Sequence, residues 1–285
     1  MKISFEKLIL GSAQFDFKYG IKDFNDHTDK KNVINILQMA KNKIKFIDTA
    51  PSYENVESLL GNLCKDNFEY YTKTLSINKF DIEFVKLKIM DSIKKLNTNN
   101  LYGIFIHNFE DLNNSRFDDF YNFLHDLKKN NLIKKIGFSI YESSEVDHLL
   151  KNYDFDIIQL PINIFDQRLK DNKLKLLKKR NVKIIARSIF LQGLLLNLSN
   201  YPSYFNKWAN SLAALKDYLN KNKISEIDAC LSYVNNIESI DNLIIGVKNI
   251  QQLNSIFNAK IHNELNFEQF SNEDINLIDP RKWKK

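Results

Sequence analysis

Four residues whose side chains could move a proton follow one another in the first 107 residues. Asp48, Lys73 and His107 each end a short apolar run, and Tyr53 comes five residues after Asp48. A phenol with a pKa of about 10 is a weak acid at neutral pH, and a nearby ammonium lowers that pKa. A carboxylate would hold the ammonium in place, and an imidazole can orient a carbonyl oxygen. Together the four predict proton delivery to a carbonyl that receives a hydride.

Each of these residues also has an ordinary structural interpretation. An aspartate after a strand commonly caps a helix, a lysine at a strand end is commonly solvated, and a histidine there is often only a hydrogen-bonded neighbour. Many of the 12 tyrosines must fill the core or the surface. The catalytic interpretation therefore depends on all four side chains converging on one site.

Eight short runs rich in β-branched residues predict the strands that would position these side chains. The predicted strands span Lys7–Leu10, Lys45–Asp48, Glu69–Lys73, Leu101–His107, Ile133–Ser139, Asp156–Leu160, Val182–Arg187 and Asn242–Gly246. They show no alternation of apolar and polar residues, which indicates burial on both faces of a parallel sheet. Segments with helical apolar spacing lie between them, so the chain is predicted to be an α/β protein, a (β/α)8 TIM barrel whose chemistry lies at the carboxyl ends of the strands.

A doubly wound open sheet is the alternative, but it would need a glycine-rich phosphate turn, and the sequence has no G-x-G-x-x-G. The interval between the seventh and eighth strands, 188–241, is longer than the others. It predicts an extra helix at about Phe205–Leu219, besides the regular one at about Ser225–Asn235 with Ser225 as its N-cap. A tail follows Asn258. No linker is visible, so 1–285 is predicted to be a single domain.

Composition excludes several classes of protein. The chain has 285 residues, 44% hydrophobic and 27% charged, which is ordinary for a soluble globular protein. No apolar run is long enough for a transmembrane helix, and no secretory signal follows Met1, so we expect no membrane partner. Two cysteines, Cys64 and Cys230, make neither a disulfide framework nor a zinc cluster. These features predict a cytoplasmic protein without a metal site.

The net charge of +6 does not indicate a nucleic-acid partner. Only five of the 41 basic residues are arginine, and no basic cluster is interleaved with aromatic residues. The clusters Lys134–Lys135, Lys178–Arg180 and Lys221–Lys223 are expected at helix ends, where the macrodipole favours cations.

The segment 46–61, FIDTAPSYENVESLLG, resembles the motif of the aldo/keto reductase family, with Glu57 in its usual place. Asp48 and Tyr53 have the spacing of the family's catalytic tetrad, and Lys73 and His107 match its remaining positions. The resemblance covers about residues 8–256. It implies that Tyr53 gives the proton, Lys73 lowers its pKa, Asp48 holds Lys73, and His107 orients the carbonyl of a small-molecule substrate.

The resemblance also implies a nicotinamide cofactor, NADPH or NADH, extended across the barrel mouth. Similar segments are IGFS at 136–139, QLPIN at 159–163, ARS at 186–188 with LQGL at 191–194, and IGVK at 245–248. The implied cofactor contacts are Gly11, Ser12, Asp48, Ser139, Gln159, Arg187, Ser188, Leu191, Gly193, Gly246, Lys248 and Gln252.

The chain departs from the family pattern at three cofactor positions. Ile140 stands where the family often has asparagine, and Arg187 stands where an aromatic ring commonly stacks on the nicotinamide. Gln252 aligns with the basic residue for the 2′-phosphate. Lys248 could supply that charge, which favours NADPH with NADH as the alternative, or it could be an ordinary solvated lysine at a helix start.

Substrate features are sparser. Ala13 would leave room for a large substrate, and 166–168 (DQR) predicts a salt bridge within a loop or a substrate contact. The segments 10–14 with 19–21, and 187–193, look most like the reductases associated with bacterial surface-polysaccharide pathways, which implies a sugar or nucleotide-sugar substrate. A non-catalytic NADP(H)-binding regulatory barrel and a Schiff-base lyase using Lys73 are the alternative functions. The sequence does not indicate an oligomeric state.

Overall fold

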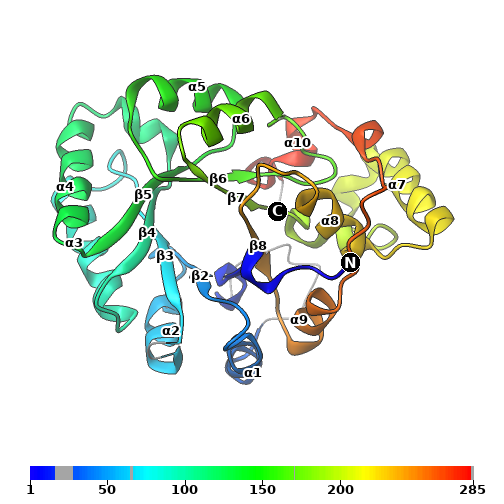
Figure 1. Ribbon diagram of the computed structural model, residues 1–285, viewed down its shortest axis with the longest axis horizontal. Helices are drawn as coiled ribbons and strands as arrows, with labels where there is room; N and C mark the ends of the chain where they lie inside the picture. Colours follow the sequence, from blue (N-terminus) through cyan, green and yellow to red (C-terminus); the bar gives the residue numbers. More distant parts are fainter. Residues whose placement is uncertain (17–27, 65–66, 170, 284–285) are drawn as a thin grey trace.

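The computed structural model describes residues 1–16, 28–64, 67–169 and 171–283. Eight parallel strands form a closed barrel in chain order, and the last pairs with the first (Figure 1). The strands are β1 Leu8–Gly11, β2 Phe46–Asp48, β3 Glu69–Lys73, β4 Leu101–Ile106, β5 Ile133–Ser139, β6 Ile157–Pro161, β7 Lys183–Arg187 and β8 Asn242–Gly246. The predicted (β/α)8 barrel is confirmed, and every predicted strand boundary agrees to within one residue.

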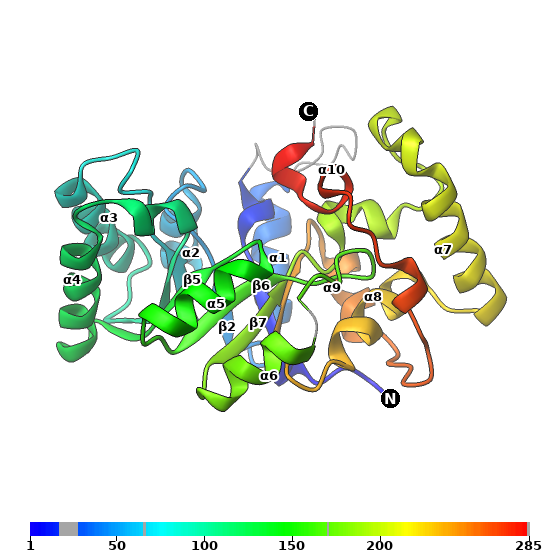
Figure 2. The same ribbon diagram turned by 90° about the horizontal axis from the view of Figure 1, so that it is seen from above.

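Helices surround the barrel (Figures 1 and 2). They are α1 Lys30–Ala40, α2 Val56–Cys64, α3 Ile82–Lys95, α4 Phe117–Lys129, α5 Ser143–Asn152, α6 Asp171–Lys179, α7 Ala209–Asn222, α8 Glu226–Asn235, α9 Ile250–Phe257 and α10 Ile275–Ile278. The predicted extra helix is α7, preceded by a 3-10 segment at Ser203–Trp208. Ser225 caps α8 as predicted, because its side chain accepts the backbone N–H of Asp228.

Apolar side chains fill both sides of the strands. Inside the barrel one layer of buried residues forms its own cluster, made of Ile9, Phe46, Tyr71, Phe105, Ile157 and Ile185. A larger core lies between the strands and the helices and includes Leu8, Leu10 and Ile47. Because successive residues of a strand point to opposite faces, burial on both faces explains the absence of alternation in the sequence.

The C-terminal tail returns across the barrel and packs against the segment before α7. Tyr204 Oη donates to the carbonyl of Asn276, and Trp208 Nε1 donates to Asp274 at 3.1 Å. Figure 2 shows this tail, in red, beside α7. The tail ends in a 3-10 turn at Pro280–Lys282, capped by the Asp279 side chain. The C-terminal tail, which the sequence predicted as an addition to the barrel, is thus a structural part of the barrel rim.

The basic clusters are placed as predicted with one exception. Lys178 and Lys179 end α6, and Lys221 ends α7. Lys134 and Lys135 instead lie in β5, so their predicted place at a helix end is wrong. Their ammonium groups pair with acids near the starts of other strands: Lys134 with Glu69 of β3 at 2.9 Å, and Lys135 with Asp156, just before β6, at 3.4 Å.

Two further findings concern what the described parts of the chain do not contain. None of their helices combines the length and the apolar character that crossing a membrane requires. No cluster of three histidine, cysteine or acidic side chains among them could hold a metal ion. The two cysteines, Cys64 and Cys230, are both buried free thiols.

Candidate active site

A buried ion pair lies at the carboxyl ends of β2 and β3. Lys73 Nζ is 2.5 Å from Asp48 Oδ2 and also donates to the carbonyl of Thr49 at 3.0 Å. Gln159, on β6 across the barrel, donates its amide N–H to the other carboxylate oxygen of Asp48 at 2.6 Å. Both members of the pair are nearly inaccessible to solvent. Because a buried charge is tolerated only when it is paired and hydrogen-bonded, this arrangement fixes the position of the ammonium.

Tyr53 and His107 join this pair around one cavity of about 360 Å³. Tyr53 lies in the turn between β2 and α2, and Lys73 Nζ is 5.5 Å from the centre of its ring. His107 directly follows β4, and its backbone N–H donates to Thr74 Oγ1. The structure thus brings together the four side chains that the sequence singled out, because parallel strands end at the same rim of the barrel.

The protonation of Tyr53 differs from the sequence-based expectation. Burial raises the pKa of Tyr53 above its ordinary value, and the negative charge of Asp48 raises it further. The expected lowering by Lys73 is not found because Asp48 compensates the ammonium at 2.5 Å while the phenol loses contact with water. A raised pKa keeps the phenol protonated at neutral pH, which is the form that a proton donor needs.

His107 is uncharged across the physiological range. Burial lowers its pKa to about 3, and the charges of Lys73, Arg187 and Arg281 lower it as well. A neutral imidazole carries one N–H donor, so His107 can donate a hydrogen bond without adding charge. The cavity therefore combines a protonated phenol, a neutral imidazole and a paired ammonium.

Most of the predicted cofactor contacts line the same cavity. They are Gly11, Asp48, Ser139, Gln159, Arg187, Ser188, Gly193 and Gly246. Ser12 and Leu191 are completely buried beside the cavity and do not line it. Lys248 and Gln252 lie at the start of α9, outside the cavity lining, where Gln252 Oε1 accepts the backbone N–H of Lys248 at 2.8 Å. The side-chain oxygen of Gln252 is thus used in the local turn.

Two side chains fit the carboxamide of a nicotinamide ring. Gln159 uses its amide nitrogen on Asp48, and its buried Oε1 has no hydrogen-bond partner among the residues that the structure describes. Ser139, at the end of the adjacent strand β5, is also buried and lines the cavity. A buried unpaired acceptor is costly, and a carboxamide N–H would satisfy it. The donor and acceptor set at the ends of β5 and β6 therefore suits the predicted cofactor.

The loop after β7 has an unusual backbone. Ser188, Leu191, Gln192 and Gly193 all have positive φ, between 46° and 96°. Such conformations are costly for residues other than glycine and concentrate at functional sites. Side-chain amides hold the loop from both sides, since Asn163 donates to the carbonyl of Ser188 and Asn197 donates to that of Gly193. The strained loop presents Ser188, Gln192 and Gly193 to the cavity.

Sequence reasoning missed several residues of the lining. They are Tyr141, Ile244, Pro280 and Arg281, whereas Ala13, Gln14, Ile189, Phe190 and Gln192 lie within the segments 10–14 and 187–193 that the resemblance singled out. Tyr141 and Arg281 are the chemically important omissions. No sequence signal indicates that the tail reaches the rim, because that contact depends on tertiary packing.

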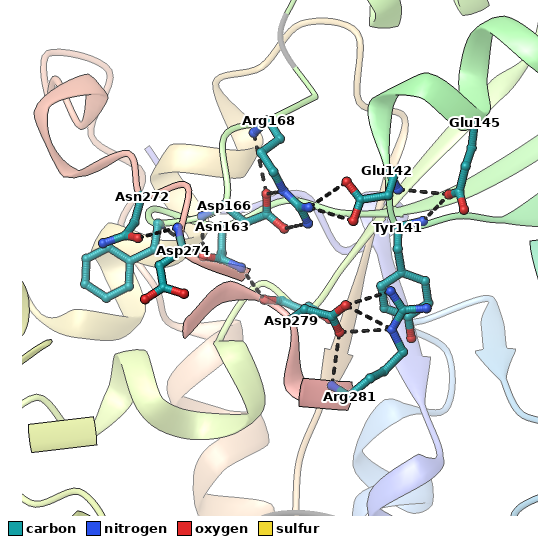
Figure 3. Close-up of polar contacts among 12 residues, drawn as sticks. Tyr141, Glu142, Glu145, Asn163, Asp166, Arg168, Asn272, Asp274, Asp279 and Arg281 are labelled. Carbon is teal, nitrogen blue, oxygen red and sulfur yellow. Dashed lines mark hydrogen bonds and ion pairs between the residues drawn. The ribbon is translucent and has the colours of Figure 1, made fainter. Parts of the chain in front are cut away.

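The 166–168 loop is the predicted salt bridge. Arg168 donates from Nε to Asp166 Oδ1 at 2.9 Å, and its Nη1 reaches both oxygens of Glu142 (Figure 3). These groups lie outside the cavity lining, so the substrate-contact alternative is not supported. The predicted similarity at Tyr19, Gly20 and Ile21 lies outside the described residues.

The chain is similar to known proteins over almost its whole length. The aldo/keto reductase family model matches residues 7–280. Among solved structures, the fold is similar to aldo-keto reductase AKR11C1 from Bacillus halodurans in its holo form, with a TM-score of 0.74, 16% identity and 99% coverage of both chains. It is also similar to glycerol dehydrogenase AKR11B4 from Gluconobacter oxydans, with a TM-score of 0.69, 16% identity and coverage of 96% of this chain and 92% of that one.

No curated protein sequence matches the chain. The solved structures are less than 25% identical to it, so they bear on the fold alone, whereas the family model matches the sequence itself over 7–280. With the closed barrel and the side chains gathered at its mouth, that match means that the chain belongs to the aldo/keto reductase family.

Proposed function

We propose that the protein is an NAD(P)H-dependent carbonyl reductase in which Tyr53 is the general acid. The observation that carries the proposal is the buried Lys73–Asp48 pair, whose ammonium lies 5.5 Å from the Tyr53 ring beside the same cavity that His107 lines. Family membership supports oxidoreductase chemistry on a small-molecule carbonyl compound. Carbonyl reduction requires a proton donor, a group that orients the carbonyl oxygen and a nearby cation, and here all three lie at one cavity.

Each of the four side chains has a distinct role in this proposal. Tyr53 holds a proton at neutral pH, as an ordinary phenol does and more firmly because burial raises its pKa, and gives that proton to the developing alkoxide. Lys73 stabilises the phenolate that remains, and Asp48 keeps Lys73 in place. His107, neutral because burial lowers its pKa to about 3, donates an N–H to the carbonyl oxygen and so orients it.

A bound NADPH or NADH would supply the hydride. Ser139 and Gln159 would hold its carboxamide, and the loop after β7 with Ser188 and Gly193 would border the rest of the molecule. The preference for NADPH rests on Lys248, which lies half-buried just after β8. We also propose that the protein is a single domain and that it is cytoplasmic. The two buried free thiols support the cytoplasmic location.

The test is an activity screen with purified protein, NADPH and NADH side by side, and a panel of aldehydes, ketones and sugars. Oxidation of the reduced cofactor that depends on the carbonyl compound, with formation of the alcohol, supports a reductase. Tight cofactor binding without turnover on any compound would instead identify a regulatory barrel. Borohydride trapping of an adduct on Lys73 would identify a Schiff-base lyase.

A further inference from the structure

Two arginines and a tyrosine meet at the cavity rim from three separate parts of the chain. Arg187 ends β7, Tyr141 follows β5, and Arg281 lies in the C-terminal turn at Pro280–Lys282. The guanidinium carbon of Arg187 is 4.0 Å from the centre of the Tyr141 ring, and that of Arg281 is 3.3 Å from it. All three residues line the cavity. We refer to Arg187, Tyr141 and Arg281 as the Arg–Tyr–Arg cluster.

Arg281 is held in one orientation with donors to spare. The buried Asp279 accepts from its Nε at 3.0 Å and from its Nη2 at 2.6 Å (Figure 3). Its Nη1 donates no hydrogen bond to any residue that the structure describes, and half of the side chain is exposed. A bidentate pair on one side of a guanidinium fixes its plane, so the remaining N–H groups are pre-oriented for a ligand.

Arg187 contributes positive charge that no contacting carboxylate balances. Its Nη2 donates to the carbonyl of Ile140 at 2.8 Å and its Nη1 to Ser188 Oγ at 3.3 Å. Within the described ranges no carboxylate forms an ion pair with it. The nearby acids are engaged elsewhere, since Asp166 pairs with Arg168. Such a half-buried guanidinium favours an anion supplied by a ligand.

The charges of the cluster act on the catalytic side chains. Lys73 and Asp48 form a compensated pair, and Arg281 is paired with Asp279, whereas Arg187 forms no ion pair within the described ranges. Both arginines help to lower the pKa of His107, after burial and Lys73. His107 and all three residues of the cluster line the same cavity, so one small molecule bound there can contact both.

We propose that the Arg–Tyr–Arg cluster binds an oxyanion, a carboxylate or a phosphate, carried by the carbonyl substrate. The inference rests on the proposed reductase function and names its substrate class: carbonyl compounds with an anionic group. Tyr141 contacts both guanidinium groups with its ring and so holds them next to each other. The tail residue Arg281 supplies N–H groups that are available to the anion. The cluster then holds the anion while the carbonyl end of the substrate reaches His107 and Tyr53.

Matched substrate pairs test the proposal and separate the two anions. Butanal is compared with 4-oxobutanoate, and glyceraldehyde with glyceraldehyde 3-phosphate. We expect the wild-type protein to reduce at least one charged member with kcat/KM about 10-fold or more above that of its neutral partner, the scale of one or two charge-assisted hydrogen bonds. The pair that shows the preference tells whether carboxylate or phosphate is the natural group.

Arg281→Met removes the free donors and keeps an unbranched side chain. It is expected to lower the ratio of kcat/KM for the charged substrate to kcat/KM for its neutral partner about 10- to 100-fold, mainly by raising KM for the charged substrate. Asp279→Asn/Arg281→Met gives the same result without an unpaired buried carboxylate. The control is Arg116→Met: Arg116 has the same side-chain exposure of 50% and an ion pair with Glu83, but lies outside the cavity lining.

Calorimetric titration with succinate and inorganic phosphate gives a readout that needs no turnover. We expect one of these anions to bind protein saturated with NADPH, and Arg281→Met but not Arg116→Met to weaken that binding about 10-fold or more. If the anion binds in this way and no carbonyl compound is reduced, the oxyanion site stands and the proposed function fails. Equal reduction of charged and neutral substrates by the wild type, or a 10-fold loss of NADPH affinity in Arg281→Met, would overturn the inference.

Discussion

Acidification is expected to destabilise the protein through His107. Burial lowers the pKa of this imidazole to about 3, and the charges of Lys73, Arg187 and Arg281 oppose its protonation. In the unfolded chain the pKa returns to about 6.5, so the unfolded state binds the proton more tightly. The contribution of the neutral His107 to the free energy of unfolding is therefore fully present above the unfolded pKa, and it is lost as the pH falls from about 6.5 toward 3.

The size of the effect follows from these two pKa values. Between pH 8 and pH 5 the linkage relation gives a loss of about 2 kcal/mol in the free energy of unfolding. Urea unfolding at the two pH values measures that loss for the wild type and for His107→Gln, which cannot bind the proton. We expect the variant to lose about 2 kcal/mol less than the wild type over the same interval.

His125→Gln is the matched control, because His125 is exposed on α4 and its replacement should leave the pH dependence of the wild type unchanged. Ring-proton NMR signals of His107 should stay those of a neutral imidazole down to pH 5. Parallel loss of stability in the wild type and His107→Gln, or a midpoint near 6.5 in the NMR titration, would refute the reasoning.

Three other predictions concern the ion pair, the cofactor and the fold. Lys73→Met leaves Asp48 as a buried charge without a cation and should cost about 3–5 kcal/mol in urea unfolding, whereas Asp48→Asn/Lys73→Met should recover most of that stability without recovering activity. Lys248→Ala should weaken NADPH binding by about 1 kcal/mol or more in a fluorescence titration and barely alter NADH, and equal losses would show that Lys248 does not discriminate. Gly61→Ala, in α2, would put a Cβ 2.0 Å from the carbonyl oxygen of Lys95, the last residue of α3, and should destabilise the fold by about 1–3 kcal/mol; an unchanged melting temperature would contradict this close approach of the two helices.

The strands, and the meeting of Asp48, Tyr53, Lys73 and His107 at one cavity, were predictable because both depend on local pattern. Runs such as FID before Thr49 and EYYTK at Glu69–Lys73 are too short for helices and rich in β-branched and aromatic residues, and their carboxyl ends share one rim once the barrel closes. The polar residue at each strand tip was therefore placed correctly relative to the others. The prediction failed for the basic pair Lys134 and Lys135, which lies within β5, a strand whose bounds were predicted correctly, and not at a helix end.

The protonation states of Tyr53 and His107, and the residues that meet at the rim of the cavity, could not be predicted from the sequence. The sign of the shift at Tyr53 depends on burial and on the distances to Asp48 and Lys73, which only the folded structure sets. Arg187 was predicted to contact the cofactor and lines the cavity, but its contact with the ring of Tyr141, which follows a different strand, was not predictable. Arg281 is more than 90 residues from Arg187 in sequence, and docking of the tail alone brings them to one cavity.

The central claim is that Tyr53 gives the proton in carbonyl reduction, and the kinetics of Tyr53→Phe test it most directly. The variant keeps the ring and removes the hydroxyl, so it should lose transition-state stabilisation and little ground-state binding. We predict that kcat falls at least ~100-fold on the best substrate of the screen while cofactor affinity stays within about threefold. Tyr121→Phe is the control, because it removes a phenol that donates to the carbonyl of Asp154 away from the cavity. Retention of most of the wild-type activity by Tyr53→Phe would contradict the account and require another proton donor.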